Sequence, residues 1–269
     1  TEKLPVLVGF PEADRLGFPA LLAGQIIEKL QNSLGIVFHT EFSRVISSGH
    51  TSGFEALTVA RELLKLDDIT SCLICSVDSY IRAGSLLWLD QHWRLKTKEN
   101  SDGVIPGEAA GAILVCSNVK DFSSPDVRIA GLGFGCEVAT VATEEPLFCI
   151  GLKKASKLAL SEAGIDMHEI NFRLSDVTGE SYGFREQALL LSGILRVRSE
   201  FGFPIWHCSE NVGDIGAVAG IIQIVYAFSA YQKKYIPGKV AMCFTSSING
   251  NRAVAIMTGN PVSYQRLHK

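Results

Sequence analysis

The chain has 269 residues, of which 47% are hydrophobic, and its formal net charge is −3. This length and apolar content suffice for a large buried core in one or two domains. The charge provides no basic surface for nucleic acid or an anionic membrane, and no apolar run in the sequence reaches the length that spans a bilayer.

Segments with the apolar pattern of strands alternate along the chain with segments of helical periodicity. In the first half we expect strands at 5–10, 42–46, 71–77 and 109–116, and helices at 20–30, 54–66 and 85–92. In the second half we expect strands at 127–133, 172–176 and 203–207, helices at 146–163, 184–195 and 212–231, and a closing hairpin of 240–244 and 253–258. Asn249 and Gly250 predict the turn of this hairpin. The strand at 71–77 is continuously apolar, which is typical of burial on both faces.

The alternation predicts an α/β protein of two similar halves, at residues 1–120 and 126–269. Residues 118–125 between them are rich in Ser, Asp and Pro and predict a linker. Each half is expected to contain a parallel-type sheet covered by helices, so that the same architecture is used twice.

Seven cysteines are scattered through apolar segments, an odd number that does not fit a disulfide scaffold. Cys72 and Cys75 have the spacing of a redox motif but lie within a predicted strand, so we expect buried free thiols and a reducing cytoplasm. No second cysteine pair completes a zinc site. Residues 131–135 (GLGFG) lack the third glycine and the downstream acid of a dinucleotide site, so no cofactor is expected.

The most informative segment is 47–53 (SSGHTSG), where a predicted strand turns into a predicted helix. This geometry places His50 on the first helical turn, where unpaired N–H groups and the positive end of the helix dipole lie. A cysteine at this position would be a nucleophile with a lowered pKa. The chain has a histidine instead.

Four segments, in this order, resemble the β-ketoacyl synthases of the thiolase-like superfamily. They are 48–53 (SGHTSG), 102–111 (DGVIPGEAAG), 211–220 (NVGDIGAVAG) and 244–251 (FTSSINGN). The first resembles the run around the family's nucleophilic cysteine, the second its DGFVxGEGAG run, the third its GHxxGAAG loop, and the fourth its glycine-rich turn before the final strand. The resemblance covers nearly the whole chain and implies a thiolase-like fold, with two similar mixed-sheet halves in αβαβα layers. Such enzymes are considerably longer, and because 5–10 matches an inner strand, the N-terminal half is expected to be incomplete.

Under this resemblance, every chemical group of the family's active site is replaced. His50 occupies the position of the nucleophilic cysteine, Asp214 that of one catalytic histidine, and Asp176, to within one residue, that of the other; the family's supporting lysine falls near Ser209. Decarboxylative condensation needs a thiolate and two histidine donors. The resemblance therefore implies a non-catalytic β-ketoacyl synthase-like protein that acts as a scaffold, assembly factor or acyl-carrier-binding partner.

An alternative is an acyltransferase or thioester hydrolase with altered chemistry. A neutral His50 next to Asp176 or Asp214 resembles a general base, and an acyl-imidazole would suit hydrolysis or transfer. Cys208 follows a histidine and invites the same interpretation, but adjacent side chains at a strand end point to opposite faces, which favours a structural thiol. Glu180 and Glu186 are either site carboxylates or partners of a helix dipole. Trp88, Trp93 and Trp206 line either a groove or the core.

The strand at 42–46 would end the N-terminal sheet of a synthase-like fold, with an exposed apolar edge. We therefore expect a homodimer through this strand. An acyl-carrier protein or another protein is the further partner that the resemblance implies.

Overall fold

The computed structural model describes residues 3–15, 18, 21–117, 126–200 and 202–260. The first half contains β1 (Val6–Gly9), α1 (Leu21–Leu34), β2 (Arg44–Ile46), the 3₁₀ turn η1 (Gly49–Thr51), α2 (Ser52–Leu63), β3 (Ser71–Ser79), α3 (Ala83–Gln91) and β4 (Glu108–Cys116). The second half contains β5 (Asp126–Cys136), α4 (Ile150–Ala163), η2 (Met167–Glu169), β6 (Phe172–Ser175), α5 (Ser181–Ile194), β7 (Ile205–His207), α6 (Ser209–Val212), η3 (Gly216–Val218), α7 (Ala219–Lys233), β8 (Val240–Ser246) and β9 (Asn251–Asn260). Each expected strand is therefore found, whereas the predicted linker at 118–125 lies outside the described residues.

The two sheets repeat one topology. Within the described residues, the strand order is β2-β1-β3-β4 in the first sheet and β5-β9-β8-β6-β7 in the second. β1 is parallel to β2 and β3, and β4 is antiparallel to β3. In the same way, β6 is parallel to β7 and β8, and β9 is antiparallel to β8. The second sheet has one further strand, β5, which is antiparallel to β9.

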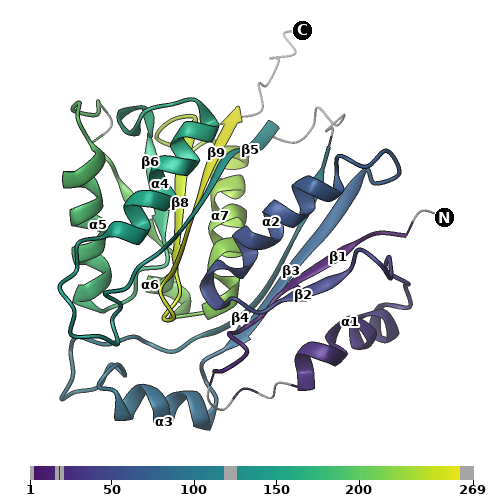
Figure 1. The fold of residues 1–269 in the computed structure, drawn as a ribbon, viewed down its shortest axis with the longest axis horizontal. Helices are drawn as coiled ribbons and strands as arrows, with labels where there is room; N and C mark the ends of the chain where they lie inside the picture. The colour runs from purple at the N-terminus through teal and green to yellow at the C-terminus, as the bar shows by residue number, and fades with distance from the viewer. Residues whose placement is uncertain (1–2, 16–17, 19–20, 118–125, 201, 261–269) are drawn as a thin grey trace, which may run out of the picture.

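The elements form alternating helix and sheet layers (Figure 1). α2 and α7 lie between the two sheets, and the central core includes Phe54 and Ile221 from these helices. α4 and α5 cover the outer face of the second sheet, and α1 packs on the outer face of the first. The fold class and the layering predicted from the sequence are confirmed. Within the described ranges, no helix combines the length and apolarity needed to cross a bilayer.

β5 and α4 are in unusually close contact, which explains the glycines at 131–135. A Cβ atom at Gly131 would lie 2.1 Å from the carbonyl oxygen of Ala159, and one at Gly133 would lie 1.9 Å from that of Ala155. Only a strand without these side chains allows the helix backbone to approach so closely. The glycine pattern thus serves helix–strand packing.

Two expectations need correction. The predicted helix at 212–231 is divided into α6, η3 and α7, because Gly213 and Gly216 adopt φ values of 73° and 50°. A Cβ atom at Gly216 would also lie 2.0 Å from a carboxylate oxygen of Asp78, so a continuous helix does not fit here. The strand predicted to be buried on both faces, now β3, is buried on one face only, and its Val77 is 36% exposed.

Candidate functional site

The predicted elbow is present, and it buries His50 at the start of α2. β2 ends at Ile46, the turn η1 follows, and α2 begins at Ser52. Gly49 has φ 59°, and a Cβ atom there would lie 1.9 Å from a carboxylate oxygen of Glu12. Glycine therefore permits the tight turn, and His50 follows with only 6% of its surface exposed.

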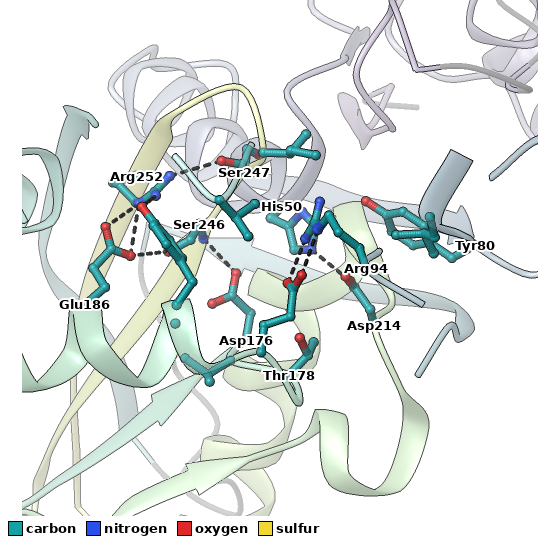
Figure 2. A pocket seen from close by; sticks show the side chains of 17 residues that line it. His50, Tyr80, Arg94, Asp176, Thr178, Glu186, Asp214, Ser246, Ser247 and Arg252 are labelled. Atoms are coloured by element: carbon teal, nitrogen blue, oxygen red, sulfur yellow. Dashed lines mark hydrogen bonds and ion pairs between the residues drawn. The ribbon is translucent and has the colours of Figure 1, made fainter. Parts of the chain in front are cut away.

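His50 and Asp214 form a direct contact in the interior (Figure 2). The distance from His50 Nε2 to Asp214 Oδ1 is 2.8 Å, and Asp214 is also buried. Asp214 Oδ1 further accepts the N–H of Gly216 at 3.0 Å. The prediction that the two residues face one pocket is confirmed by this geometry.

The family-like motifs dock onto one another around this pair. The Asp214 N–H donates to the carbonyl of Ile105 at 2.7 Å, and the Gly107 N–H donates to the carbonyl of Asp214 at 2.8 Å. The Ser247 hydroxyl donates to the carbonyl of Ser48 at 2.7 Å. Segments 102–111 and 244–251 therefore hold the Asp214 loop and the elbow in place.

The electrostatics keep both partners charged. Burial opposes the charge on His50, but the charge and hydrogen bond of Asp214 outweigh it and raise the pKa of His50 to about 9. Burial likewise opposes the charge on Asp214, and the nearby imidazolium reverses that effect and lowers the pKa of Asp214 to about 2. These shifts favour the imidazolium form of His50 at neutral pH, and that form has no lone pair for nucleophilic attack or proton abstraction.

Asp176 lines the same cavity but has a different partner. It follows β6, and its Oδ2 accepts the N–H of Ser246 at 2.6 Å. Burial raises the pKa of Asp176 to about 6, although His50 and the Ser246 bond favour its charged form. His50, Asp176 and Asp214, which the sequence placed at one site, all line this cavity. Of the two carboxylates, Asp214 makes the hydrogen bond to His50.

Two arginine–glutamate pairs complete the wall of the cavity. Arg94 binds Glu180 through two hydrogen bonds of 2.7 Å each, and Arg252 Nε lies 2.9 Å from Glu186 Oε1. Glu180 and Glu186 therefore both line the cavity, and the negative charge of each is balanced by an arginine. The sequence interpretation missed both arginines. A lone arginine in the apolar run 252–257 was a signal for Arg252, since a buried guanidinium needs a partner, whereas nothing marked Arg94.

The cavity is small. Its volume is about 70 Å³, and its lining includes His50, Asp176 and Asp214. Sites for drug-sized ligands usually occupy about 300–1,000 Å³. His50 Nδ1 is buried and has no hydrogen-bond partner among the described residues. No group of three His, Cys, Asp or Glu residues in the described part of the chain is placed to hold a metal ion.

The other candidates lie outside this chemistry. Burial raises the pKa of the Cys208 thiol to about 11, so it is protonated at neutral pH and fits the structural interpretation. The neighbouring His207 ring packs against Phe184, with ring centres 5.6 Å apart. Trp206 packs against Phe172, Trp88 stacks on His92, and Trp93 is 73% exposed.

No family model and no curated protein matches the sequence, but the fold matches solved structures. The ketosynthase from module 6 of the bacillaene synthase of Bacillus subtilis has a TM-score of 0.73 and 15% identity over 96% of this chain and 54% of that one. A type II polyketide complex of a ketosynthase with its acyl-carrier protein, AntDE:AntF, has a TM-score of 0.71 and 16% identity over 86% and 66%. A β-ketoacyl synthase from Burkholderia phymatum has a TM-score of 0.67 and 16% identity over 95% and 75%.

These matches establish that the chain has the thiolase-like fold of ketosynthases, as its sequence predicts. The chain spans 54% to 66% of the length of the first three matched structures. The first sheet agrees with this shorter span, because within the described residues it has no counterpart of β5.

Proposed function

We propose that this chain is a ketosynthase-fold protein without condensation activity that acts as a scaffold or binding partner of another protein. The observation that carries the proposal is the ion pair of His50 with Asp214 at the position where the resembling enzymes have their nucleophile. An imidazolium that is buried and paired cannot accept an acyl group from a thioester, since attack requires a free lone pair.

The replaced histidine positions support the same conclusion. Asp176 and Asp214 present carboxylates to the cavity, where the condensation would develop negative charge on an enolate and an oxyanion. A carboxylate repels such charge. Loss of one oxyanion donor alone costs about 10²–10³ in rate. The cavity of about 70 Å³ also leaves little room for an acyl chain.

The matched structures suggest the class of partner. The AntDE:AntF structure contains an acyl-carrier protein, and a matched structure from Xenorhabdus doucetiae is a ketosynthase in complex with its chain length factor. We propose that the partner of this chain is an acyl-carrier protein or a ketosynthase-fold protein. The seven cysteines are free, in keeping with the reducing cytoplasm that we propose as the compartment.

The second candidate is an acyltransferase or thioester hydrolase that uses His50. The bond between His50 and Asp214 favours it, because a carboxylate that orients an imidazole is a common general-base arrangement. This reaction needs neutral His50, so its rate would rise with pH through about 9. A rate that is independent of pH in this range would contradict it.

The proposal is tested by acyl-carrier condensation with a malonyl donor, for the wild type and for His50→Ala. We expect no product from either protein, with an active ketosynthase as the positive control. Incubation with a pantetheine-linked acyl donor should leave both His50 and Cys208 unlabelled. Turnover by the wild type that His50→Ala abolishes would overturn the proposal.

A reconstruction separates lost chemistry from a lost scaffold. In the double variant His50→Cys with Asp214→His, a thiol stands at the elbow and an imidazole stands opposite. Partial condensation activity in this variant would show that the scaffold still positions an acyl thioester. Titration of the wild type with an acyl-carrier protein, monitored by calorimetry, tests the binding role separately.

A further inference from the structure

The two helices on the outer face of the second sheet carry a local excess of positive charge. Residues 146–161, which cover most of α4, contain three lysines and no acidic residue. Residues 187–199, at the end of α5, contain two arginines and no acidic residue. The whole chain, by contrast, has 28 acidic and 25 basic residues, so its charge is unevenly distributed and these cations gather on one layer.

Most of these five cations are available to a partner. Four of them are exposed, namely Lys154, Lys157, Arg196 and Arg198. None of the four bonds to a carboxylate within the described residues. The fifth, Lys153, donates to the carbonyl of Phe148 at 2.9 Å.

The cations of the two helices form one surface, because α4 and α5 pack closely together. A Cβ atom at Gly193, near the end of α5, would lie 2.3 Å from Cε of Lys153. Leu195, directly before Arg196, packs on the apolar cluster that includes Leu152 of α4. Both helices belong to the outermost layer of the second half, with the second sheet between them and the first half (Figure 1).

The exposed face of α4 combines charge with apolar side chains. Four residues follow at helical intervals of four, three and one, namely Ile150, Lys154, Lys157 and Leu158, so they share one face. Ile150 is 64% exposed and Leu158 is 48% exposed. Together with Arg196 and Arg198, these four residues form the basic surface. Docking surfaces combine exposed apolar side chains with polar ones in this way.

Charge complementarity decides which kind of partner fits. The unpaired cations attract an acidic partner over a Debye length of about 8 Å at physiological ionic strength. An acidic protein helix supplies both carboxylates for the cations and apolar side chains for Ile150 and Leu158. An anionic membrane fits less well, because the net charge of −3 opposes the approach of the whole molecule.

We propose that the basic surface binds an acidic amphipathic helix of a partner protein. The carboxylates of that helix lie against Lys154, Lys157 and the two arginines, and its apolar residues pack on Ile150 and Leu158. The proposal names the surface through which a partner binds, so it rests on the binding role proposed above. It is independent of the chemistry at His50.

Calorimetric titration of the full chain with an acyl-carrier protein tests the basic surface. Because salt screens exposed charges, the Kd should rise between about 0.05 and 0.3 M salt. In the double variant Lys154→Glu with Lys157→Glu, the Kd should rise by roughly tenfold or more, since two attractive contacts become like-charge contacts. Lys29→Glu with Lys98→Glu is the matched control, because both lysines are exposed outside the basic surface and the net charge changes equally. Its Kd should stay within about twofold of the wild type.

A further variant probes the apolar contact. Leu158→Ser should weaken binding without changing its dependence on salt, because it removes apolar area and no charge. Circular dichroism should show that all variants keep the fold, since the substituted side chains are exposed.

The outcomes separate the surface from the binding role. Carrier binding that Lys154→Glu with Lys157→Glu leaves unchanged would overturn the basic surface and leave the binding role in place. Equal weakening in the control would show an effect of net charge alone and would also overturn the surface.

Two other probes cover the remaining cases. If the carrier does not bind the wild type, the carrier assignment fails, and a synthetic amphipathic helix of glutamate and leucine tests the surface alone. No binding of this helix would overturn the basic surface. Binding to vesicles that contain phosphatidylserine, if the double variant Lys154→Glu with Lys157→Glu lost it, would identify a lipid surface as the occupant and overturn the proposal.

Discussion

At the scale of single residues, the His50–Asp214 pair combines two groups that burial alone would keep uncharged. Each charge stabilises the other strongly enough to offset desolvation. Because the pKa of His50 is raised, its contribution to stability is complete below about 6.5 and is lost as pH rises through about 9. Because the pKa of Asp214 is lowered, its contribution is complete above about 3.8 and is lost as pH falls through about 2.

The variant Asp214→Asn tests this coupling, because asparagine keeps the shape but removes the charge. Burial then dominates, so the pKa of His50 should fall below its usual value, as measured by NMR titration of the imidazole. Urea unfolding at pH 7 should show a loss of about 3–5 kcal/mol, the usual result of removing one partner of a buried pair.

The exposed pair of Glu62 with Lys65 provides the control for this variant. Glu62→Gln should leave both the unfolding midpoint and the titration of His50 unchanged, because solvent screens a surface pair. If the pKa of His50 stayed near 9 in Asp214→Asn, a group other than Asp214 would be responsible for raising it.

The sequence allowed prediction of His50 and Asp214 because each replaces a residue in a recognisable motif, and of Asp176 because it stands at the end of the strand where the family has its other histidine. It did not reveal Arg94, whose partner Glu180 lies 86 residues away along the chain. A pair of this kind depends on how two distant elements pack, which local periodicity does not encode.

At the scale of elements, the glycine-rich run at 131–135 allows β5 to pack closely against α4, although such a run is more familiar from nucleotide-binding loops. The glycines that superficially resemble a nucleotide-binding loop face the backbone of α4 instead. Sequence periodicity predicted both elements but not their separation. Sequence periodicity also predicted one continuous helix across Gly213 and Gly216, because the small apolar residues there keep helical spacing. The positive φ values of these two glycines interrupt that helix.

Gly133→Ala tests this packing. The added Cβ would lie 1.9 Å from the carbonyl oxygen of Ala155 and 2.7 Å from the N atom of Ala159, both of them backbone atoms. α4 must therefore move away from β5, and we expect a loss of about 1–3 kcal/mol in the free energy of unfolding, measured with urea.

The matched control is Gly24→Ala in α1. A Cβ atom at Gly24 meets nothing within 4 Å, so alanine should stabilise the helix by about 0.5–1 kcal/mol. Equal effects of the two substitutions would contradict the packing explanation.

At the scale of the whole molecule, the alternation of strands and helices predicted two similar halves, each with a sheet covered by helices, and the family resemblance predicted how these layers are stacked. One groove of the assembled molecule could not be read from the sequence. The groove of about 710 Å³ arises only when α2, α7, β4 and β5 are assembled, because each contributes a few apolar residues.

We expect the chain to form a homodimer through β2, at one end of the first sheet. Within the described residues β2 is the terminal strand of its sheet, with Arg44 exposed and Val45 and Ile46 partly buried. A terminal strand of this kind is stabilised when a second copy pairs with its edge. Light scattering at micromolar concentration should therefore report a dimer, and Val45→Lys should shift it towards a monomer, because the interface would bury an unpaired charge.

Val45 also packs partly against the cluster of Val6, Val8 and Phe10, so thermal unfolding must accompany the measurement. Val197→Lys is the matched control, since Val197 is 54% exposed and far from β2 in the chain, and it should remain dimeric. A wild-type monomer at micromolar concentration would contradict the prediction. A Val45→Lys protein that is folded and still dimeric would place the interface elsewhere, because a buried lysine on β2 could not be tolerated at a strand-to-strand contact without a partner charge.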